Sequence, residues 1–237
     1  MKTRIAAILP VLVLSASAVL WCQDQAAGKA AVQQRVAELK QTIAENRARL
    51  MKYQWQQNTV VTIKGVPKKD EAMSCRYAPD GTVQKTSLGP GPIPQQQPPG
   101  GLKGKIAAKK IAEMKDYTER LKSLISHYAP PNPVMIQDAV RAGNVSLDAS
   151  GGIATLTFTN FYKPGDKAAF GFDPSTKKLV SYNVNTYLDD PKTDIVTMTN
   201  TFDHLQDGTT YMSETVLTSE GKQIQITTTN SNYEPVT

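Results

Sequence analysis

The second half of the chain is dominated by short segments in which apolar and polar residues alternate. GIATLTFTNF places Ala154, Leu156 and Phe158 on one face of an extended strand, and LVSYNVNTY does the same for Tyr182 and Val184. The segments are separated by KPGD, DP and DG sequences, which are typical of tight turns. The same alternation recurs at Ala168, Phe170 and Phe172, at Val196, Met198 and Phe202, and at Met212, Val216, Ile224 and Ile226. From residue 144 onward the pattern therefore predicts an antiparallel meander of about six strands.

Two longer stretches have the three-and-four spacing of amphipathic helices. In residues 30–52 the apolar positions are Val32, Val36, Leu39, Ile43, Leu50 and Met51, and in residues 102–129 they are Ile106, Ile111, Met114, Leu121, Leu124, Ile125 and Tyr128. Prolines at positions 130, 131 and 133 end the second helix. A short helix is predicted for residues 134–141, closed by Gly143.

A strand and a hairpin are predicted between the two long helices. YQWQQNTVVTIKG places Trp55, Val61 and Ile63 on one face of the strand. A short strand at residues 73–77, the turn PDG and a returning strand at residues 82–88 form the hairpin. LGPGPIPQQQPPGG, residues 88–101, is too rich in proline and glycine for a helix or a ladder. We interpret it as a surface loop, with a proline-rich recognition motif as the alternative.

These elements predict an α+β fold for residues 24–237, taken as a single domain. Two or three strands precede the helix pair and about six follow it. A sheet with one apolar face and amphipathic helices is stable when the helices cover that face.

The N-terminus has the pattern of a secretory signal peptide, which we assign to residues 1–23. Lys2 and Arg4 precede an apolar run, and the small residues ASA fit a cleavage site after Ala18, with a cut nearer Gln23 as the alternative. The run is broken by Pro10 and is short for a spanning helix, which needs about 20 apolar residues. The sequence therefore predicts an exported, periplasmic protein.

The two cysteines raise the questions of lipid attachment and of a disulfide. Lipid attachment at Cys22 requires a small preceding residue, and the bulky Trp21 argues against it. Cys22 and Cys75 would pair in an oxidising compartment only if Cys22 survived processing. The preferred interpretation is that Cys75 is a small buried apolar residue.

The formal net charge of +6 is concentrated in the predicted helices. Residues 24–52 contain six basic and three acidic residues, and residues 102–129 contain seven and three. A basic amphipathic helix can make peripheral contact with a membrane or bind an acidic partner, although a solvated outer face is the commoner explanation. Nucleic acid is disfavoured, because the basic residues are not interleaved with aromatic ones.

The sequence offers few candidates for chemistry. His127 and His204 stand alone, and no Gly-x-Ser-x-Gly, Walker or His-Glu-x-x-His motif occurs. In YLDDPKTD, the carboxylates of Asp189, Asp190 and Asp194 could bind calcium, but their spacing fits no known loop and a turn is preferred. We therefore expect no catalytic residue, no metal and no cofactor, and a hydrolase is the least favoured function.

The order of elements resembles that of the LolA/LolB-like lipoprotein-carrier superfamily, whose members sort outer-membrane lipoproteins. The stretches that carry the resemblance are YQWQQNTVVTIKG, FGFDPSTKKLVSYNVNTY and YMSETVLTSEGKQIQITTTNSNYEPV. The resemblance implies a strongly curved antiparallel sheet, an incomplete barrel, whose open mouth is covered by helices. It also implies an apolar space that takes acyl chains.

Ten apolar strand positions are therefore predicted to line a ligand site. They are Trp55, Val61, Phe158, Phe170, Phe172, Tyr182, Val184, Met198, Phe202 and Met212. The predicted function is a non-enzymatic periplasmic protein that binds a lipid, an acyl chain or a lipoprotein. A filled core would use the same residues, and the alternative is a cell-envelope interaction or structural module without a lipid ligand.

Overall fold

The computed structural model describes residues 17–89, 101–176 and 178–236, with the side chains of residues 17–29, 101 and 102 left out. Most of the predicted signal peptide and of the proline-rich loop lies outside the described residues, as does the side chain of Cys22. The signal peptide, the loop and the pairing of Cys22 with Cys75 therefore stay predictions.

Within the described residues the chain forms three helices and ten strands. The helices are α1 (Ser17–Leu50), α2 (Gly101–Ser126) and α3 (Pro133–Arg141). The strands are β1 (Tyr53–Ile63), β2 (Val66–Tyr77), β3 (Val83–Ser87), β4 (Val145–Asp148), β5 (Ala154–Thr159), β6 (Lys167–Phe172), β7 (Leu179–Tyr187), β8 (Ile195–His204), β9 (Thr210–Ser219) and β10 (Ile224–Pro235). The predicted order of elements is confirmed, but some bounds differ. α1 begins at Ser17 rather than at residue 30, β2 begins earlier than expected, and β4 adds a seventh strand to the C-terminal meander.

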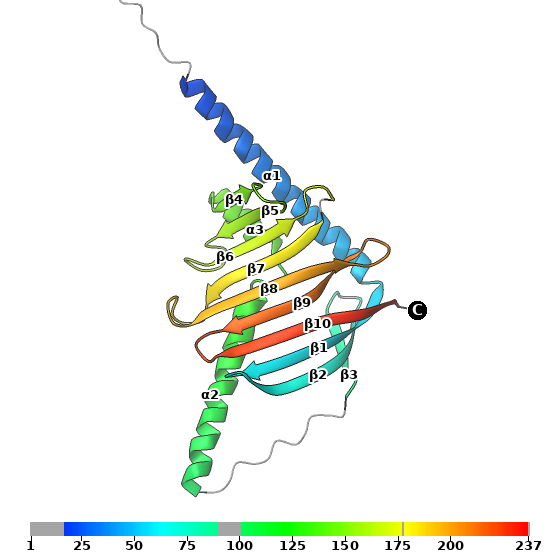
Figure 1. The fold of residues 1–237 in the computed structure, drawn as a ribbon, viewed down its shortest axis with the longest axis vertical. Coiled ribbons are helices and arrows are strands. Elements are labelled where there is room, and N and C mark those ends of the chain that lie inside the picture. Colours follow the sequence, from blue (N-terminus) through cyan, green and yellow to red (C-terminus); the bar gives the residue numbers. More distant parts are fainter. Residues whose placement is uncertain (1–16, 90–100, 177, 237) are drawn as a thin grey trace, which may run out of the picture.

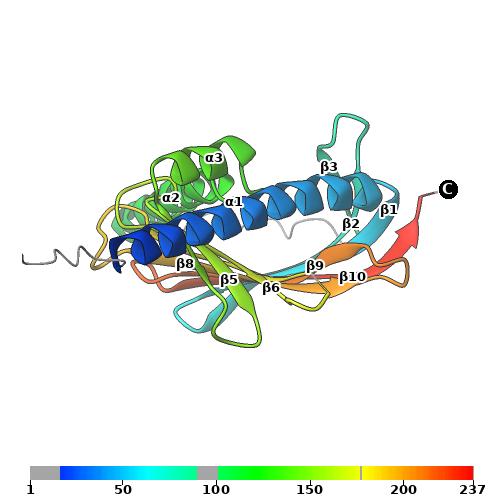
Figure 2. The same ribbon diagram turned by 90° about the horizontal axis from the view of Figure 1, so that it is seen from above.

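All ten strands belong to one antiparallel sheet in the order β3-β2-β1-β10-β9-β8-β7-β6-β5-β4 (Figure 1). β1 pairs with β10, with Val61 opposite Ile226, so the N-terminal hairpin extends the C-terminal meander. The edge strands β3 and β4 do not pair with each other, so the sheet stays open. All three helices lie on the same face of the curved sheet (Figure 2). The predicted α+β fold with helices on one face of a curved sheet is confirmed.

Local signals fix the ends of α3. The side chain of Asn132 accepts a hydrogen bond from the backbone N–H of Val134 at 2.9 Å, and Pro133 occupies the first turn. Gly143 follows the helix with a φ of 73°, a conformation that glycine adopts without strain. In the described part of the chain, no helix combines the length and the apolar character that a membrane crossing requires.

The main hydrophobic core lies between the helices and the middle of the sheet. α1 contributes Val36 and Leu39, α2 contributes Leu121 and Leu124, and α3 contributes Ile136, all of them buried. From the sheet, the core takes inward-facing residues of β5 to β10. Val36, Leu39, Leu121 and Leu124 belong to the apolar stripes predicted for residues 30–52 and 102–129, so the periodicity identified the buried faces there. Met51, Ile106 and Ile111 of the same stripes are exposed.

Candidate functional site

The ten predicted lining residues do not share one environment. Phe158, Phe170, Phe172, Tyr182, Val184 and Met198 are buried in the main core. Trp55 is buried apart from that core, and Val61, Phe202 and Met212 are half-buried. The predicted residues therefore fall into two regions of the sheet, one filled by packed side chains and one only partly covered. The alternation of apolar and polar residues along each strand does not distinguish the two.

The filled region is packed by aromatic rings. Phe170 stacks on Tyr182 with ring centroids 4.3 Å apart, and Phe158 meets Phe170 edge to face at 5.8 Å. The exposed fraction is 0% for Phe158 and Phe170 and 1% for Tyr182. The hydroxyl of Tyr182 donates to the backbone carbonyl of Tyr128 at the end of α2. These rings hold the helices on β5 to β7.

One row of directly opposed residues crosses nine strands on the helix-covered face. From β4 to β2 it consists of Val145, Phe158, Ala168, Val184, Met198, Leu217, Ile226, Val61 and Lys69. Opposed residues share a face of the sheet. Burial falls toward the β2 end of this row: Leu217 is buried, Ile226 and Val61 are half-buried, and Lys69 is exposed. An apolar strip thus runs out of the core to a charged rim.

The neighbouring row changes character at β8. It consists of Leu147, Leu156, Phe170, Tyr182, Asn200, Thr215, Thr228, Thr59 and Glu71. Its polar end is internally hydrogen bonded, with Thr215 Oγ1 donating to Asn200 Oδ1 at 2.8 Å and the Thr59 and Thr228 hydroxyls 3.4 Å apart.

These two rows define a partly covered surface on β1, β2 and β10. We call Thr59, Val61, Lys69, Ile226 and Thr228 the open inner face. It joins half-buried apolar and hydroxyl side chains to an ammonium group at the rim. Such a surface can hold a molecule whose apolar part lies on Val61 and Ile226. At the rim the ammonium of Lys69 lies 2.6 Å from the carboxylate of Glu71.

A second aromatic cluster lies at the other ends of β1, β2, β9 and β10. Trp55 stacks on Tyr233 with centroids 5.6 Å apart and lies 5.2 Å from Tyr77, and Tyr211 lies 4.4 Å from Tyr233. The indole N–H of Trp55 donates to Asn230 Oδ1 at 3.1 Å. Of these rings only Trp55 is predicted from the sequence, because its partners come from strands distant in sequence. The signal in the sequence that could have indicated the cluster is the position of these tyrosines near the ends of strands.

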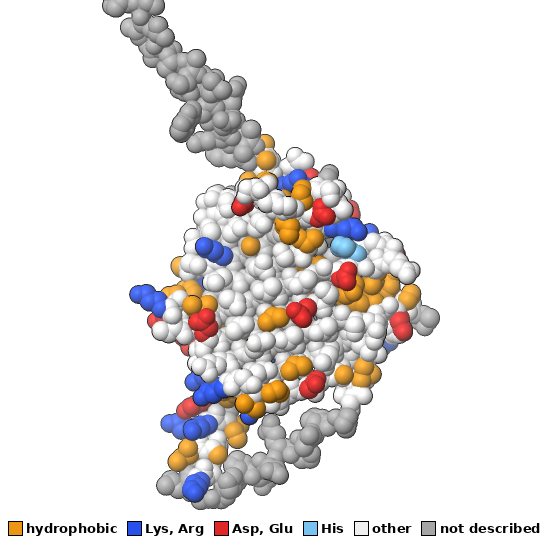
Figure 3. Space-filling model, in the orientation of Figure 1, with side chains coloured by type: hydrophobic (Ala, Val, Ile, Leu, Met, Phe, Trp, Pro, Cys, Tyr) orange, Lys and Arg blue, Asp and Glu red, His pale blue; other side chains and the backbone are white. Residues whose placement is uncertain are grey.

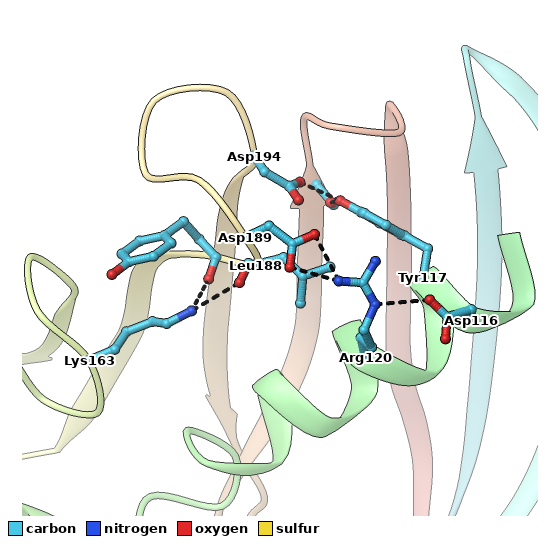
Figure 4. Close-up of polar contacts among 9 residues, drawn as sticks. Asp116, Tyr117, Arg120, Lys163, Leu188, Asp189 and Asp194 are labelled. Atoms are coloured by element: carbon cyan, nitrogen blue, oxygen red, sulfur yellow. Dashed lines mark hydrogen bonds and ion pairs between the residues drawn. The ribbon is translucent and has the colours of Figure 1, made fainter. Parts of the chain in front are cut away.

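The acidic segment YLDDPKTD forms the loop between β7 and β8, and Asp189 in it binds α2 (Figure 4). The guanidinium of Arg120 donates to both carboxylate oxygens of Asp189, at 2.7 and 2.8 Å, and to Asp116 at 3.0 Å. Lys163 donates to the backbone carbonyls of Tyr187 and Leu188 beside this pair. Asp189 therefore serves as a contact between the loop and the helix.

The other two aspartates of the loop have separate partners. Asp190 accepts from the backbone N–H groups of Lys192 and Thr193, which makes the expected turn. Asp194 is buried and accepts from the hydroxyl of Tyr117, which also contacts the hydroxyl of Ser219. Burial, followed by the hydrogen bond to Asp194, raises the pKa of Tyr117 to about 12. Among the described residues, no group of three His, Cys, Asp or Glu side chains is arranged to hold a metal.

The two histidines and Cys75 make packing or hydrogen-bond contacts within the fold. His127 stacks on Tyr162 with centroids 3.8 Å apart, and His204 Nδ1 lies 3.0 Å from the hydroxyl of Thr210. Burial lowers the pKa of His204. Cys75 is buried and forms no disulfide with a described side chain, and burial raises the pKa of its thiol.

Two surface hollows accompany the helices. One of about 140 Å³ lies along α1, between side chains such as Arg35 and Thr42 and the ring of Phe172. The other, of about 330 Å³, lies on α2 and is lined by Ile111, Met114, Lys115, Thr118 and Glu119.

Comparison with known proteins adds one structural likeness. No family model matches the chain. No curated protein matches it either. A crystal structure from Vibrio parahaemolyticus, described as an outer membrane lipoprotein-sorting protein domain, superposes with a TM-score of 0.38 at 9% sequence identity. The match covers 83% of this chain and 92% of that chain. At this identity and TM-score the likeness assigns the chain neither a family nor an activity.

Proposed function

We propose that the protein is a non-enzymatic binding protein of the periplasm for an amphipathic ligand with an apolar chain, such as a lipid or a lipidated protein. The observation that carries the proposal is the loss of burial along the apolar row, from Leu217 through Ile226 and Val61 to exposed Lys69. The ligand site lies on the open inner face rather than among the rings of Phe158, Phe170 and Tyr182.

The physical basis is the burial of apolar surface. Val61 and Ile226 are opposed across β1 and β10, so their side chains form a continuous apolar patch. An acyl chain placed on this patch covers half-exposed methyl groups and extends the core. Each methylene removed from water contributes about 0.8 kcal/mol, and affinity should rise roughly fourfold per methylene until the strip is full. At the rim Lys69 is paired with Glu71, Nζ to Oε2 at 2.6 Å, so an anionic head group there would compete with this carboxylate for the ammonium.

The test is a titration of the protein with fatty acids of increasing chain length, using displacement of a fluorescent fatty acid as the readout. We expect affinity to rise with chain length and then level off. Equal affinity for all chain lengths, or no displacement at any length, would overturn the proposal.

Two valines on the same strand provide a matched pair of variants. Val61 faces the helices and Val60 faces the opposite side, and both are half-buried. Val61→Gln should weaken fatty-acid binding about tenfold by removing part of the apolar patch, whereas Val60→Gln should leave it unchanged. Thermal unfolding of both variants shows whether either has lost its fold. Equal weakening by the two would place the ligand elsewhere.

A second function, that of an envelope interaction module, is favoured by the filled core. Phe158, Phe170 and Tyr182 are fully buried and in ring-to-ring contact, which disfavours a ligand between them. Native mass spectrometry of the exported protein separates the two functions. An extractable fatty acid or phospholipid supports the binding protein, and a bare polypeptide mass after incubation with lipid supports the module.

A further inference from the structure

Helix α2 consists of a packed half and a projecting half. Tyr117, Leu121 and Leu124 in the C-terminal half are buried in the main core. The N-terminal half, which we define as residues 103–115, extends past the sheet at the lower left of the view in Figure 1, although Met114 near its inner end still packs against the main core. There the exposed fractions of Ile106 and Ile111 are 52% and 54%.

The apolar stripe of the packed half continues into the projecting half. Positions 106, 110, 114, 117, 121 and 124 follow one another at intervals of three or four residues, so they lie on one face of the helix. In the packed half this face meets the sheet. In the projecting half the same face carries Ile106, Lys110 and Met114, with Ile111 beside it, and Ile106, Lys110 and Ile111 are exposed.

The projecting half is strongly basic. Residues 103–115 contain five lysines, at positions 103, 105, 109, 110 and 115, against one acidic residue, Glu113. Within this half of the helix, Lys109 forms an ion pair with Glu113, at an N–O distance of 3.9 Å. Blue and orange side chains appear together on this end of the molecule in Figure 3.

We infer that residues 103–115 of α2 are a docking surface for an anionic phospholipid bilayer. Lysine ammonium groups on long flexible stems reach phosphates while Ile106 and Ile111 enter the head-group region. Protein interfaces are depleted in lysine and enriched in aromatic residues and arginine, and this segment has five lysines, no aromatic residue and no arginine. Charge and composition therefore favour a lipid surface over an acidic protein. This inference does not depend on the proposed ligand site.

The test is sedimentation of the full chain with vesicles of phosphatidylcholine alone and of equal parts phosphatidylcholine and phosphatidylglycerol. The measured quantity is the extra binding to the anionic vesicles, so that apolar binding common to both vesicles cancels. The charges of Lys2 and Arg4 are the same in every variant and therefore cancel in the comparison between variants. We expect the double variant Lys103→Glu, Lys110→Glu to weaken this extra binding by about tenfold or more, because each lysine near an anionic surface contributes appreciably. High salt should weaken it in the unaltered protein.

The matched control is Lys52→Glu with Lys167→Glu, which changes the net charge equally at exposed positions outside α2. This control should keep most of the extra binding. Equal losses in the two double variants would show a net-charge effect and overturn the inference, as would an absence of extra binding in the unaltered chain. Retention of the chain by immobilised polyglutamate without binding to anionic vesicles would instead identify an acidic protein as the partner.

Discussion

At the scale of single residues, two buried tyrosines, Tyr117 in α2 and Tyr128 just after it, add hydrogen bonds to the sheet and its loops. The hydroxyl of Tyr117 reaches Asp194 and Ser219, and that of Tyr128 reaches Asp166 and Thr186. A buried carboxylate that loses its hydrogen-bond donor still bears the full free-energy cost of removal from water. The hydroxyl groups of Tyr117 and Tyr128 therefore contribute to stability in addition to the burial of their rings.

Tyr117→Phe is the test of this contact. We expect the free energy of unfolding at neutral pH to fall by about 1–3 kcal/mol, because Asp194 loses a hydrogen-bond donor. Urea unfolding measures the change. Tyr187→Phe, which removes a donor to the backbone carbonyl of Pro164 near the surface, should change stability by less than about 0.5 kcal/mol.

The same variant should also change the alkaline limit of stability. The pKa of Tyr117 is raised from its ordinary value of 10 to about 12, so folding favours the protonated phenol. Its contribution is complete below pH 10 and is lost as the pH rises to about 12. Between these values the unaltered protein should lose stability more steeply than Tyr117→Phe. Parallel pH profiles would show that Tyr117 does not titrate in this way.

At the scale of elements, the C-terminal half of α2 provides most of the packing that holds this helix on the sheet. The side chain of Leu121 is 1% exposed in the core, whereas Ile111 is more than half exposed. The ion pair of Arg120 with Asp189 is partly exposed, and such pairs contribute about 0–1 kcal/mol. Apolar packing in the C-terminal half is therefore the main force that holds α2 on the sheet.

Two truncations on this helix test the division. Leu121→Ala should lower the free energy of unfolding by about 2–5 kcal/mol, because it leaves a cavity in the core. Ile111→Ala should change it by less than about 0.5 kcal/mol, since the side chain contacts mainly solvent. Denaturant midpoints of the two variants provide the comparison. A large cost at Ile111 would mean that the projecting half packs against the rest of the chain in solution.

At the scale of the whole molecule, the sheet combines a filled centre with less protected margins. β6, β7 and β8 each have paired strands on both sides and a buried inner face. β3 is an edge strand whose five residues are all exposed. Local opening requires little free energy where few apolar contacts are lost.

Hydrogen exchange should reproduce this arrangement. We expect amide protons of β6 to β8 to exchange most slowly, near the limit set by global unfolding, and those of β3 to exchange fastest among the strands. Mass spectrometry of exchanged peptides resolves these segments. Equal protection of β3 and β7 would indicate that β3 is covered in solution.

Much of the architecture was determined by the sequence itself. Alternation identified the strands, the three-and-four spacing identified the buried faces of α1 and α2, and turn sequences such as PDG separated the hairpin strands. Local periodicity determines these features because it reports which face of an element is apolar. For the same reason Val61 and Phe158 were assigned the same role, although one is half-buried and the other fully buried.

Only the tertiary structure decided how each apolar face is covered. Pairing of β1 with β10 brings Val61 beside Ile226 and Trp55 beside Tyr233, contacts between segments more than a hundred residues apart. The length of α2 relative to the sheet leaves Ile106 exposed although it shares a stripe with buried Leu121. Covering depends on which distant surfaces meet, and no local pattern in the chain encodes that meeting. The open inner face and the projecting half of α2 are therefore products of the tertiary structure.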